Sequence, residues 1–115
     1  MKKVALLAYN GELMCFAHVM LYALDFDTKG YEVKVVIEGS ATKLISELAK
    51  PDAPFAHIYN QLKEKGLLTC ICQACSQKMG TYDEAERQGL AIVGDMQGHP
   101  SIDKYVAEGY EIISF

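Results

Sequence analysis

Short apolar runs alternate along the chain with segments in which apolar residues recur at helical spacing. Most of these runs are apolar at consecutive positions, without the alternation of a strand that has one face in water. They comprise residues 4–9, 32–37, 67–72, 90–93 and 111–115. Strands of this kind are typical of a parallel sheet that helices cover on both faces. The pattern therefore predicts an α/β fold with a five-stranded, mostly parallel sheet.

Helices are expected between the strands, because apolar residues recur there every three or four positions. Such spacing is found in residues 41–49, 55–62 and 102–106. Ser40 is expected to cap the first of these helices, and Thr81 with Glu84 has the spacing of a capping box for another short helix. Alternating strands and helices give right-handed βαβ units. We therefore expect a single domain, residues 1–115, folded as a three-layer α/β/α sandwich.

The first expected helix, residues 13–27, differs from the others because it is apolar on every side. From Leu13 to Leu24, only His18 can carry a charge. A helix that is apolar all round has to be buried all round, and the sheet covers only one side of it. A neighbouring helix of the same chain or a second subunit would have to cover the other side. The sequence favours the subunit interface, and hence a homo-oligomer.

Charge and hydropathy exclude several classes of partner. The chain has 115 residues and a formal net charge of −4. An acidic chain without a basic cluster does not attract phosphate backbones or anionic membranes, so neither nucleic acid nor a membrane is expected as a partner. No apolar stretch approaches the ~20 residues that span a bilayer, and the apolar start is interrupted by Asn10 and Gly11 without a signal-peptide cleavage site. We therefore expect a cytoplasmic protein.

Residues that can bind a ligand follow the expected strands. In an open α/β sheet, ligands and reactive groups collect beyond the carboxyl ends of the strands. The candidate binding residues from these positions and the segment after them are Asn10, Gly11, Lys78, Asp95 and His99. The chain has no glycine-rich nucleotide-binding loop and no serine-hydrolase motif. No cofactor and no resident metal are predicted.

Cys75 is the candidate nucleophile. It is expected at the start of a short helical segment, residues 76–79, where unpaired backbone N–H groups would face its sulfur. The thiolate is the reactive form, and an unperturbed cysteine is only about 3% ionised at pH 7. A pKa lowered by about two units would raise the thiolate fraction about twentyfold. In a reducing compartment, the clustering of Cys70, Cys72 and Cys75 indicates a reactive thiol or a metal rather than a structural disulfide.

Two other interpretations of the cysteine cluster stay open. Cys72 and Cys75 form a C-x-x-C pair, which can mark a dithiol redox site in an α/β protein. That interpretation fits less well if the first cysteine ends a strand and the second begins a helix. Cys70, Cys72 and Cys75 with His99 or Cys15 could bind zinc. Against zinc, Cys70 is expected inside a buried strand, and the second ligand pair of a structural zinc site is missing.

The order and spacing of these features resemble the DsrE/DsrF-like family of small sulfur-relay proteins. The resemblance is carried by the first strand with Asn10 and Gly11, the apolar first helix, the strand that leads to Cys75, Gly80, and residues 109–113. It implies a five-stranded parallel α/β/α fold and assembly into trimers or hexamers. In sulfur-transferring members, a cysteine after the third strand carries sulfur as a persulfide, and Cys75 matches that position. The cysteine cluster departs from the single cysteine of the relay members.

The leading hypothesis is therefore a cytoplasmic sulfur-relay protein that holds sulfur as a persulfide on Cys75, with sulfur donor and acceptor proteins as partners. Cys72 would resolve the persulfide as a disulfide, with release of sulfide. Whether the chain acts as a sulfur transferase is left open by the sequence. The alternative is a non-catalytic oligomeric module that binds a small ligand or a partner.

Overall fold

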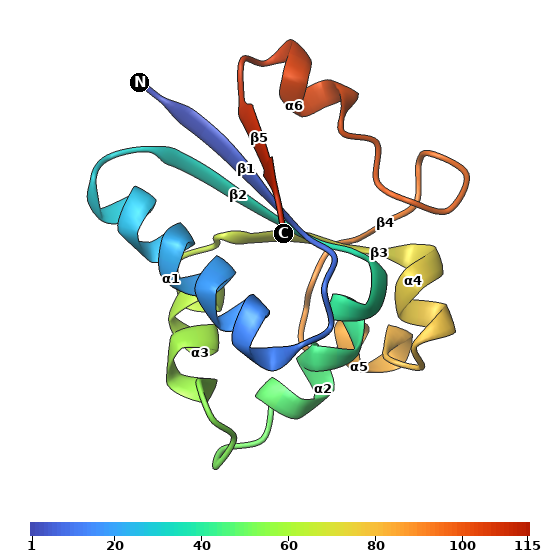
Figure 1. Cartoon of the computed structure of the whole chain (residues 1–115). Coiled ribbons are helices and arrows are strands. Elements are labelled where there is room, and N and C mark those ends of the chain that lie inside the picture. Colours follow the sequence, from blue (N-terminus) through green and yellow to red (C-terminus); the bar gives the residue numbers. More distant parts are fainter.

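The computed structural model describes residues 1–115 and contains a five-stranded sheet (Figure 1). Its strands are β1 (Lys3–Ala8), β2 (Glu32–Ile37), β3 (Leu68–Cys72), β4 (Ile92–Val93) and β5 (Glu111–Ser114). They lie in the order β4-β3-β2-β1-β5, and every neighbouring pair is parallel. The predicted α/β fold with a five-stranded sheet is confirmed. Because all strands run the same way, their carboxyl ends meet at one edge of the sheet.

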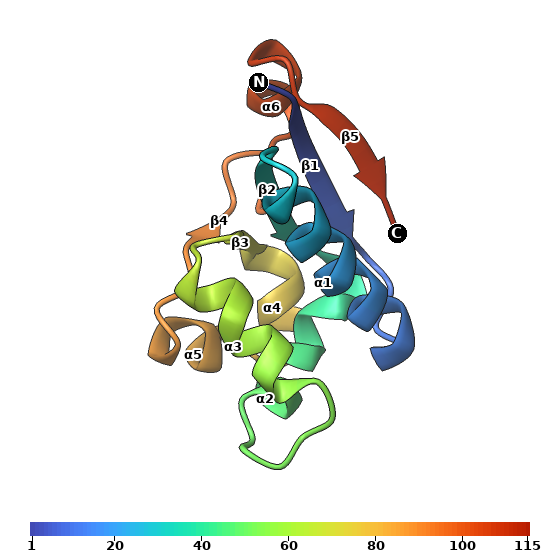
Figure 2. The same ribbon diagram turned by 90° about the vertical axis from the view of Figure 1, so that its left-hand side faces the viewer.

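The helices cover the two faces of the sheet unequally. They are α1 (Leu13–Thr28), the 3-10 helix η1 (Gly39–Lys43), α2 (Leu44–Leu48), α3 (Ala56–Glu64), α4 (Gln73–Lys78), α5 (Tyr82–Arg87) and α6 (Asp103–Ala107). The larger apolar cluster joins one face of β1 and β2 to α1, α2, α3 and α5. A smaller cluster on the other face includes Tyr105 of α6 and Tyr110. Figures 1 and 2 show α6 alone on its side of the sheet.

This arrangement is a three-layer sandwich in which one outer layer is thin. The larger cluster buries side chains such as Phe16, Met20 and Ile45 with almost no exposure to solvent. The smaller cluster has only six buried residues, among them Ala5, Leu7 and Cys70. Burial of apolar area is the main stabilising term of a fold, so most of the stability comes from the thick side.

Some expected strand ends and helix caps are wrong. The expected fourth strand, residues 90–93, is shorter in the structure, where β4 contains only Ile92 and Val93 and pairs with β3 alone. Ser40 does not cap a helix: its Oγ accepts a hydrogen bond from the Gly11 N–H at 2.9 Å. Thr81 lies at the N-cap of α5 but makes no cap, because its hydroxyl donates to the Thr42 carbonyl at 2.9 Å.

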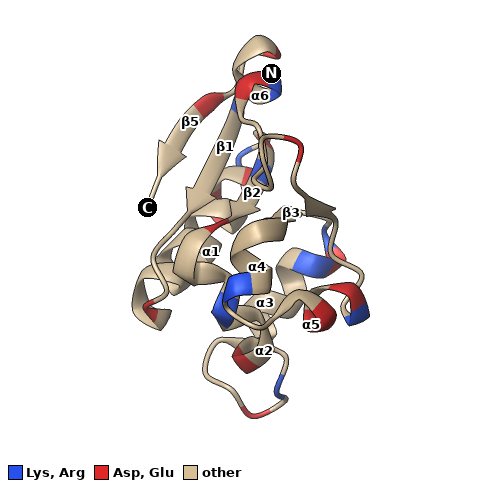
Figure 3. Cartoon of the chain, turned by 90° about the vertical axis from the view of Figure 1, so that its right-hand side faces the viewer, with Lys and Arg blue, Asp and Glu red and all other residues tan.

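Helix α1 is buried on one side and exposes apolar side chains on the other. Its buried residues are Phe16, Ala17, Val19, Met20 and Ala23. The opposite side carries what we call the α1 strip, which consists of Met14, His18, Leu21 and Tyr22. Met14 is 58% exposed, and most of the α1 ribbon carries neither acidic nor basic colour in Figure 3. Within one chain, α1 is therefore not covered on every side.

No helix of the chain combines the length and the hydropathy that crossing a membrane requires.

Candidate functional site

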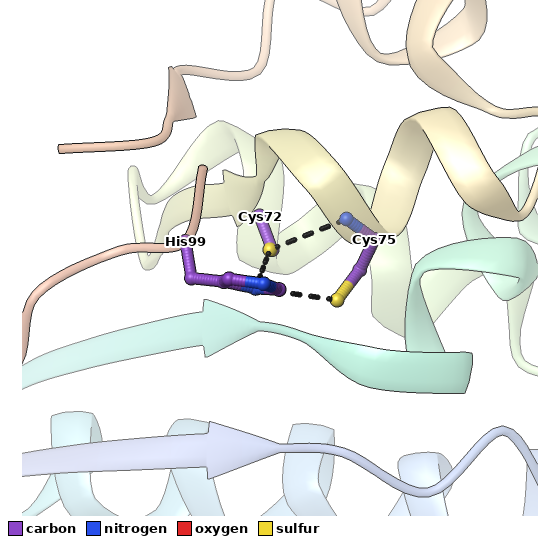
Figure 4. Close-up of side chains that lie close together, drawn as sticks. All are labelled: Cys72, Cys75 and His99. Atoms are coloured by element: carbon purple, nitrogen blue, oxygen red, sulfur yellow. Dashed lines mark hydrogen bonds between the residues drawn. The ribbon is translucent and has the colours of Figure 1, made fainter. Parts of the chain in front are cut away.

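Three side chains from two distant parts of the sequence meet at the carboxyl edge of the sheet. They are Cys72 at the end of β3, Cys75 in α4 and His99 in the loop after β4 (Figure 4). The His99 Nδ1 lies 3.0 Å from the Cys72 Sγ and 3.7 Å from the Cys75 Sγ. We call these three residues the thiol–imidazole cluster. Cys75 and His99, two of the candidates expected beyond strand ends, therefore lie at one edge of the sheet.

The passage from β3 into α4 sets the positions of the two sulfurs. The strand ends at Cys72 and the helix begins at the next residue, so Cys72 is the N-cap of α4. The backbone N–H of Cys75 donates to the Cys72 Sγ at 3.4 Å. The expectation that Cys75 starts the helix is wrong, because the helix starts before it and Cys75 lies in its first turn. A backbone N–H of the first helical turn, which has no partner within the helix, therefore faces the sulfur of Cys72.

The loop after β4 is held against α4, which fixes the place of His99. The Ala74 N–H donates to the Gly98 carbonyl at 2.8 Å, and the Met96 N–H donates to the His99 carbonyl at 2.7 Å. Gly98 has a φ of +94°, a left-handed conformation that favours glycine. A Cβ at Gly98 would also lie 3.2 Å from the Ala74 Cβ, so a larger residue would push the loop away from α4.

The two sulfurs differ in their access to solvent. Cys72 is fully buried, and this burial raises the pKa of its thiol to about 12. Cys75 is only partly buried. At neutral pH, Cys72 is therefore a neutral thiol, whereas the sulfur that a reagent can reach belongs to Cys75.

A buried carboxyl group beside the cluster was missed by the sequence analysis. Glu38 directly follows β2 and is only 6% exposed. The Tyr9 hydroxyl, which follows β1, donates to the Glu38 Oε2 at 3.1 Å. Burial raises the pKa of Glu38, while the Tyr9 hydrogen bond and the charge of His99 oppose this rise. Both residues lie at strand ends, so the strand-end rule could have found them.

None of the hydrogen bonds of the other candidate binding residues involves the two sulfurs. Asn10 is exposed, and its Oδ1 accepts the Glu12 N–H at 2.8 Å. The Gly11 N–H is bound by the Ser40 hydroxyl. Asp95 accepts the Ser101 N–H at 3.0 Å, and Lys78 is exposed in the last turn of α4. Their roles in binding stay predictions.

The remaining cysteines are not part of the cluster. Cys70 lies on the same face of β3 as Cys72, but it is buried in the smaller apolar cluster with its Sγ 3.9 Å from the Tyr105 hydroxyl. Cys15 is partly buried on α1. The ligand set expected for zinc therefore changes, because the donor atoms that come together belong to Cys72, Cys75 and His99.

Comparison with known proteins identifies the family. The sequence model of the DsrE/DsrF-like family matches residues 5–115. The chain belongs to this family. An uncharacterized protein of Methanocaldococcus jannaschii is 30% identical over 96 residues, which are 84% of this chain and 76% of that protein. An uncharacterized protein of Archaeoglobus fulgidus is 44% identical over 41 residues, covering 36% of this chain and 67% of its own length.

A solved structure shows the same fold. A conserved protein of unknown function from Bacteroides thetaiotaomicron superposes on this DsrE/DsrF-like chain with a TM-score of 0.70. The match covers 99% of this chain and 95% of that chain, at 18% sequence identity. The likeness therefore supports the architecture.

The geometry of this DsrE/DsrF-like site permits three kinds of chemistry. A thiol that solvent reaches can act as a nucleophile, and an imidazole nitrogen at 3.7 Å can exchange a proton with it. Two neighbouring cysteines can form a disulfide after a side-chain rotation. Two sulfurs and one imidazole nitrogen can also bind a metal ion.

Proposed function

We propose that this protein carries sulfur as a persulfide on Cys75. The observation that carries the proposal is the pairing of a partly exposed thiol with the imidazole of His99 beside a second, buried thiol. Membership of the DsrE/DsrF-like family supports a role in sulfur relay. Because burial keeps Cys72 protonated, Cys75 is the sulfur that meets the donor.

Loading is a transfer of one sulfur atom between thiols. The His99 imidazole takes the proton of Cys75, and the thiolate attacks the outer sulfur of a donor persulfide, R–S–SH. A new S–S bond forms on Cys75 while the S–S bond of the donor breaks. The donor leaves as R–S⁻ and takes up the proton, so the products are Cys75–S–SH and R–SH. An acceptor thiolate that attacks the same outer sulfur takes it away by the reverse pattern.

Cys72 provides a second way to discharge the persulfide. The Cys72 thiol passes its proton to the His99 Nδ1, which lies 3.0 Å away, and attacks the Cys75 Sγ. The bond to the outer sulfur breaks, HS⁻ leaves, and a Cys72–Cys75 disulfide forms. The two cysteines are oxidised by two electrons and the carried sulfur is reduced to sulfide. A dithiol reductant then restores both thiols.

Mass spectrometry of the intact, metal-free protein tests the proposal. After incubation with a persulfide donor, the protein should gain the mass of one sulfur atom, and digestion should locate it on Cys75. The Cys75→Ser variant should lose this gain, whereas Cys15→Ser, which replaces a partly buried cysteine outside the cluster, should keep it. A gain of sulfur that survives Cys75→Ser would overturn the proposal. In a non-catalytic binding module, native Cys75 would instead react with alkylating reagents like a free thiol.

A dithiol redox protein is a second candidate, and the place of the two cysteines favours it. Cys72 lies at the N-cap of α4 and Cys75 one turn inside, which is the order of a dithiol pair at a helix start. In that case a disulfide reagent should form the Cys72–Cys75 bond with no sulfur bound beforehand. A persulfide donor should then give the disulfide without a detectable persulfide, even in the presence of excess donor.

We also propose that the protein acts in the cytoplasm as an oligomer of identical chains. The α1 strip leaves Leu21 and Tyr22 each 46% exposed, and the Tyr22 ring lies 5.7 Å from the Phe115 ring beside the edge strand β5. Exposed apolar patches of this kind are typical of interaction sites. Light scattering at micromolar concentration should give a multiple of the chain mass, and Leu21→Glu should reduce it. A monomer before the substitution would contradict the proposal.

A further inference from the structure

The thiol–imidazole cluster brings together three metal-binding atoms. One donor atom from each of Cys72, Cys75 and His99 lies within 4.8 Å of the other two. A single imidazole nitrogen, the His99 Nδ1, faces both sulfurs. One nitrogen carries either one proton or one lone pair, so it cannot serve both sulfurs equally by hydrogen bonding. A cation between the three atoms could bind all of them at once.

We propose that Cys72, Cys75 and His99 form a binding site for a thiophilic divalent cation, with Zn²⁺ as the ion that fits best. Thiolate and imidazole are the ligands that zinc takes most readily in proteins. Two thiolates balance the two positive charges of the ion, so the complete site adds no net charge to a buried place.

One of the three distances already fits a tetrahedral ion, and the two sulfurs lie within 4.8 Å of each other. With Zn–S near 2.3 Å and Zn–N near 2.0–2.1 Å, a tetrahedral site needs S···N edges of about 3.6 Å and an S···S edge of about 3.8 Å. The Cys75 Sγ already lies 3.7 Å from the His99 Nδ1. The Cys72 Sγ lies at 3.0 Å from that nitrogen and would move outward by about 0.6 Å. Side-chain rotations of this size need no change in the backbone.

Backbone contacts around the three ligands would orient them. The Cys75 N–H already donates to the Cys72 Sγ at 3.4 Å, as an outer-shell donor to a metal-bound thiolate does. The loop that carries His99 is fixed to α4 by the bond from Ala74 to the Gly98 carbonyl. The objection that Cys70 lies inside a buried strand also falls away, because this site does not use Cys70.

Three protein ligands leave the fourth position of the tetrahedron open. Zinc sites with an open position bind water or an added ligand, whereas closed sites serve structure alone. The cation would also hold the Cys75 thiolate that the proposed sulfur transfer uses. The metal-bound protein and the persulfide-bearing protein are therefore alternative states of one site, although zinc binding itself does not depend on sulfur transfer.

Titration of the reduced, metal-free protein with Co²⁺ and Zn²⁺ tests the site. Co²⁺ should give thiolate charge-transfer bands and the strong d–d bands of a tetrahedral ion, and one equivalent of Zn²⁺ per chain should remove them. Loss of any one ligand, in Cys72→Ser, Cys75→Ser or His99→Asn, should weaken Zn²⁺ binding by more than the 10–100-fold that is typical of outer-shell partners. Cys15→Ser and the exposed His57→Asn should bind Zn²⁺ like the unaltered protein.

Protection of Cys75 from alkylation by stoichiometric Zn²⁺ gives a second readout. Absence of tetrahedral Co²⁺ bands, or Zn²⁺ binding that persists in Cys72→Ser and His99→Asn folded to the native circular-dichroism spectrum, would overturn the inference. The outcome is distinct from that of the sulfur-transfer test. Zinc binding without persulfide formation would reject only the carrier function, and persulfide formation without zinc binding would reject only the metal site.

Discussion

Two cysteines on one face of β3 have very different surroundings. Cys70 lies in the smaller apolar cluster, where its Sγ is 3.9 Å from the Tyr105 hydroxyl. Cys72, two residues further on, faces the His99 imidazole at 3.0 Å and accepts the Cys75 N–H. Both thiols are buried, and burial raises the pKa of each.

Burial therefore does not separate the two cysteines. Their surroundings differ because Cys72 is the last residue of β3 and Cys70 is not. The strand end is where loops and helices from other parts of the chain add titratable groups. Within the strand, Cys70 is surrounded mainly by apolar groups of the neighbouring strands and α6, together with the Tyr105 hydroxyl.

The largest effect is expected from the apolar side. Tyr105 is 4% exposed and fills the thin layer under α6, so Tyr105→Ala should cost about 3 kcal/mol of unfolding free energy, close to large-to-small costs in cores. Urea unfolding measures this value, and persulfide loading should be retained where the variant is folded. His99→Ala should cost about 1 kcal/mol or less, because it removes polar contacts near the surface.

A conservative variant separates the ring from its hydroxyl. Tyr105→Phe keeps the packing and loses only the long contact with Cys70, so it should change stability by less than about 1 kcal/mol. An equal loss in both Tyr105 variants would mean that the hydroxyl, not the packing, stabilises this side.

Alkylation should show that burial lowers the reactivity of both buried cysteines. Burial raises the pKa of the Cys72 thiol to about 12, so little of it is thiolate at pH 8, and Cys72 should react at least about tenfold more slowly than a free thiol. Burial slows both Cys70 and Cys72 further. Mass spectrometry of iodoacetamide-treated native protein, with urea-unfolded protein as control, measures the rates. Fast labelling of native Cys72 would contradict its burial.

Most of the fold could be predicted from the sequence, because the thick side of the molecule repeats simple periodicities. Apolar runs marked all five strands, and the run of residues 32–37 matches β2 in full. The failures are local and have a common cause. At Ser40 and Thr81 the hydroxyls bond to residues far along the chain, Gly11 and Thr42, and a sequence pattern contains no information about such partners.

The site could be predicted only in part. The strand-end rule brought Cys75 and His99 together, although 24 residues separate them. It did not show that α4 begins directly after Cys72. As a result, the backbone N–H at the helix start, which belongs to Cys75, faces the sulfur of Cys72 and not that of Cys75. Glu38 directly follows an apolar run, so the strand-end rule could have included it, but only tertiary packing shows that its carboxyl group is buried.

The proposed resolving step predicts a further contrast between the two buried cysteines. Cys72→Ser removes the thiol beside Cys75, so sulfide release from the loaded protein should slow by about tenfold or more, since a neighbouring group reacts far faster than one in solution. Cys70→Ser, a matched change on the same strand, should release sulfide at the original rate. A sulfide-selective electrode follows the release. Equal rates in the two variants would assign the release to an external thiol instead.

The smallest effect concerns the buried carboxyl group beside the cluster. Burial raises the folded-state pKa of Glu38 above the value of about 4.3 expected in the unfolded chain. The folded state then binds the carboxyl proton of Glu38 more tightly than the unfolded state does. The resulting contribution of Glu38 to the free energy of unfolding is fully present below the unfolded-state pKa and is lost as pH rises through the folded-state pKa. Glu38→Gln removes this loss. The stability of the variant relative to the unaltered protein should therefore increase as the pH rises from about 4 through the folded-state pKa of Glu38.

Urea unfolding at several pH values measures this increase, and Glu64→Gln at an exposed position is the matched control. The control should show a stability difference that hardly changes with pH, because an exposed carboxyl group is well solvated in both states. A flat difference for Glu38→Gln would mean that the Tyr9 hydrogen bond and the charge of His99 cancel the effect of burial. In that case Glu38 would ionise in the folded protein about as readily as in the unfolded chain.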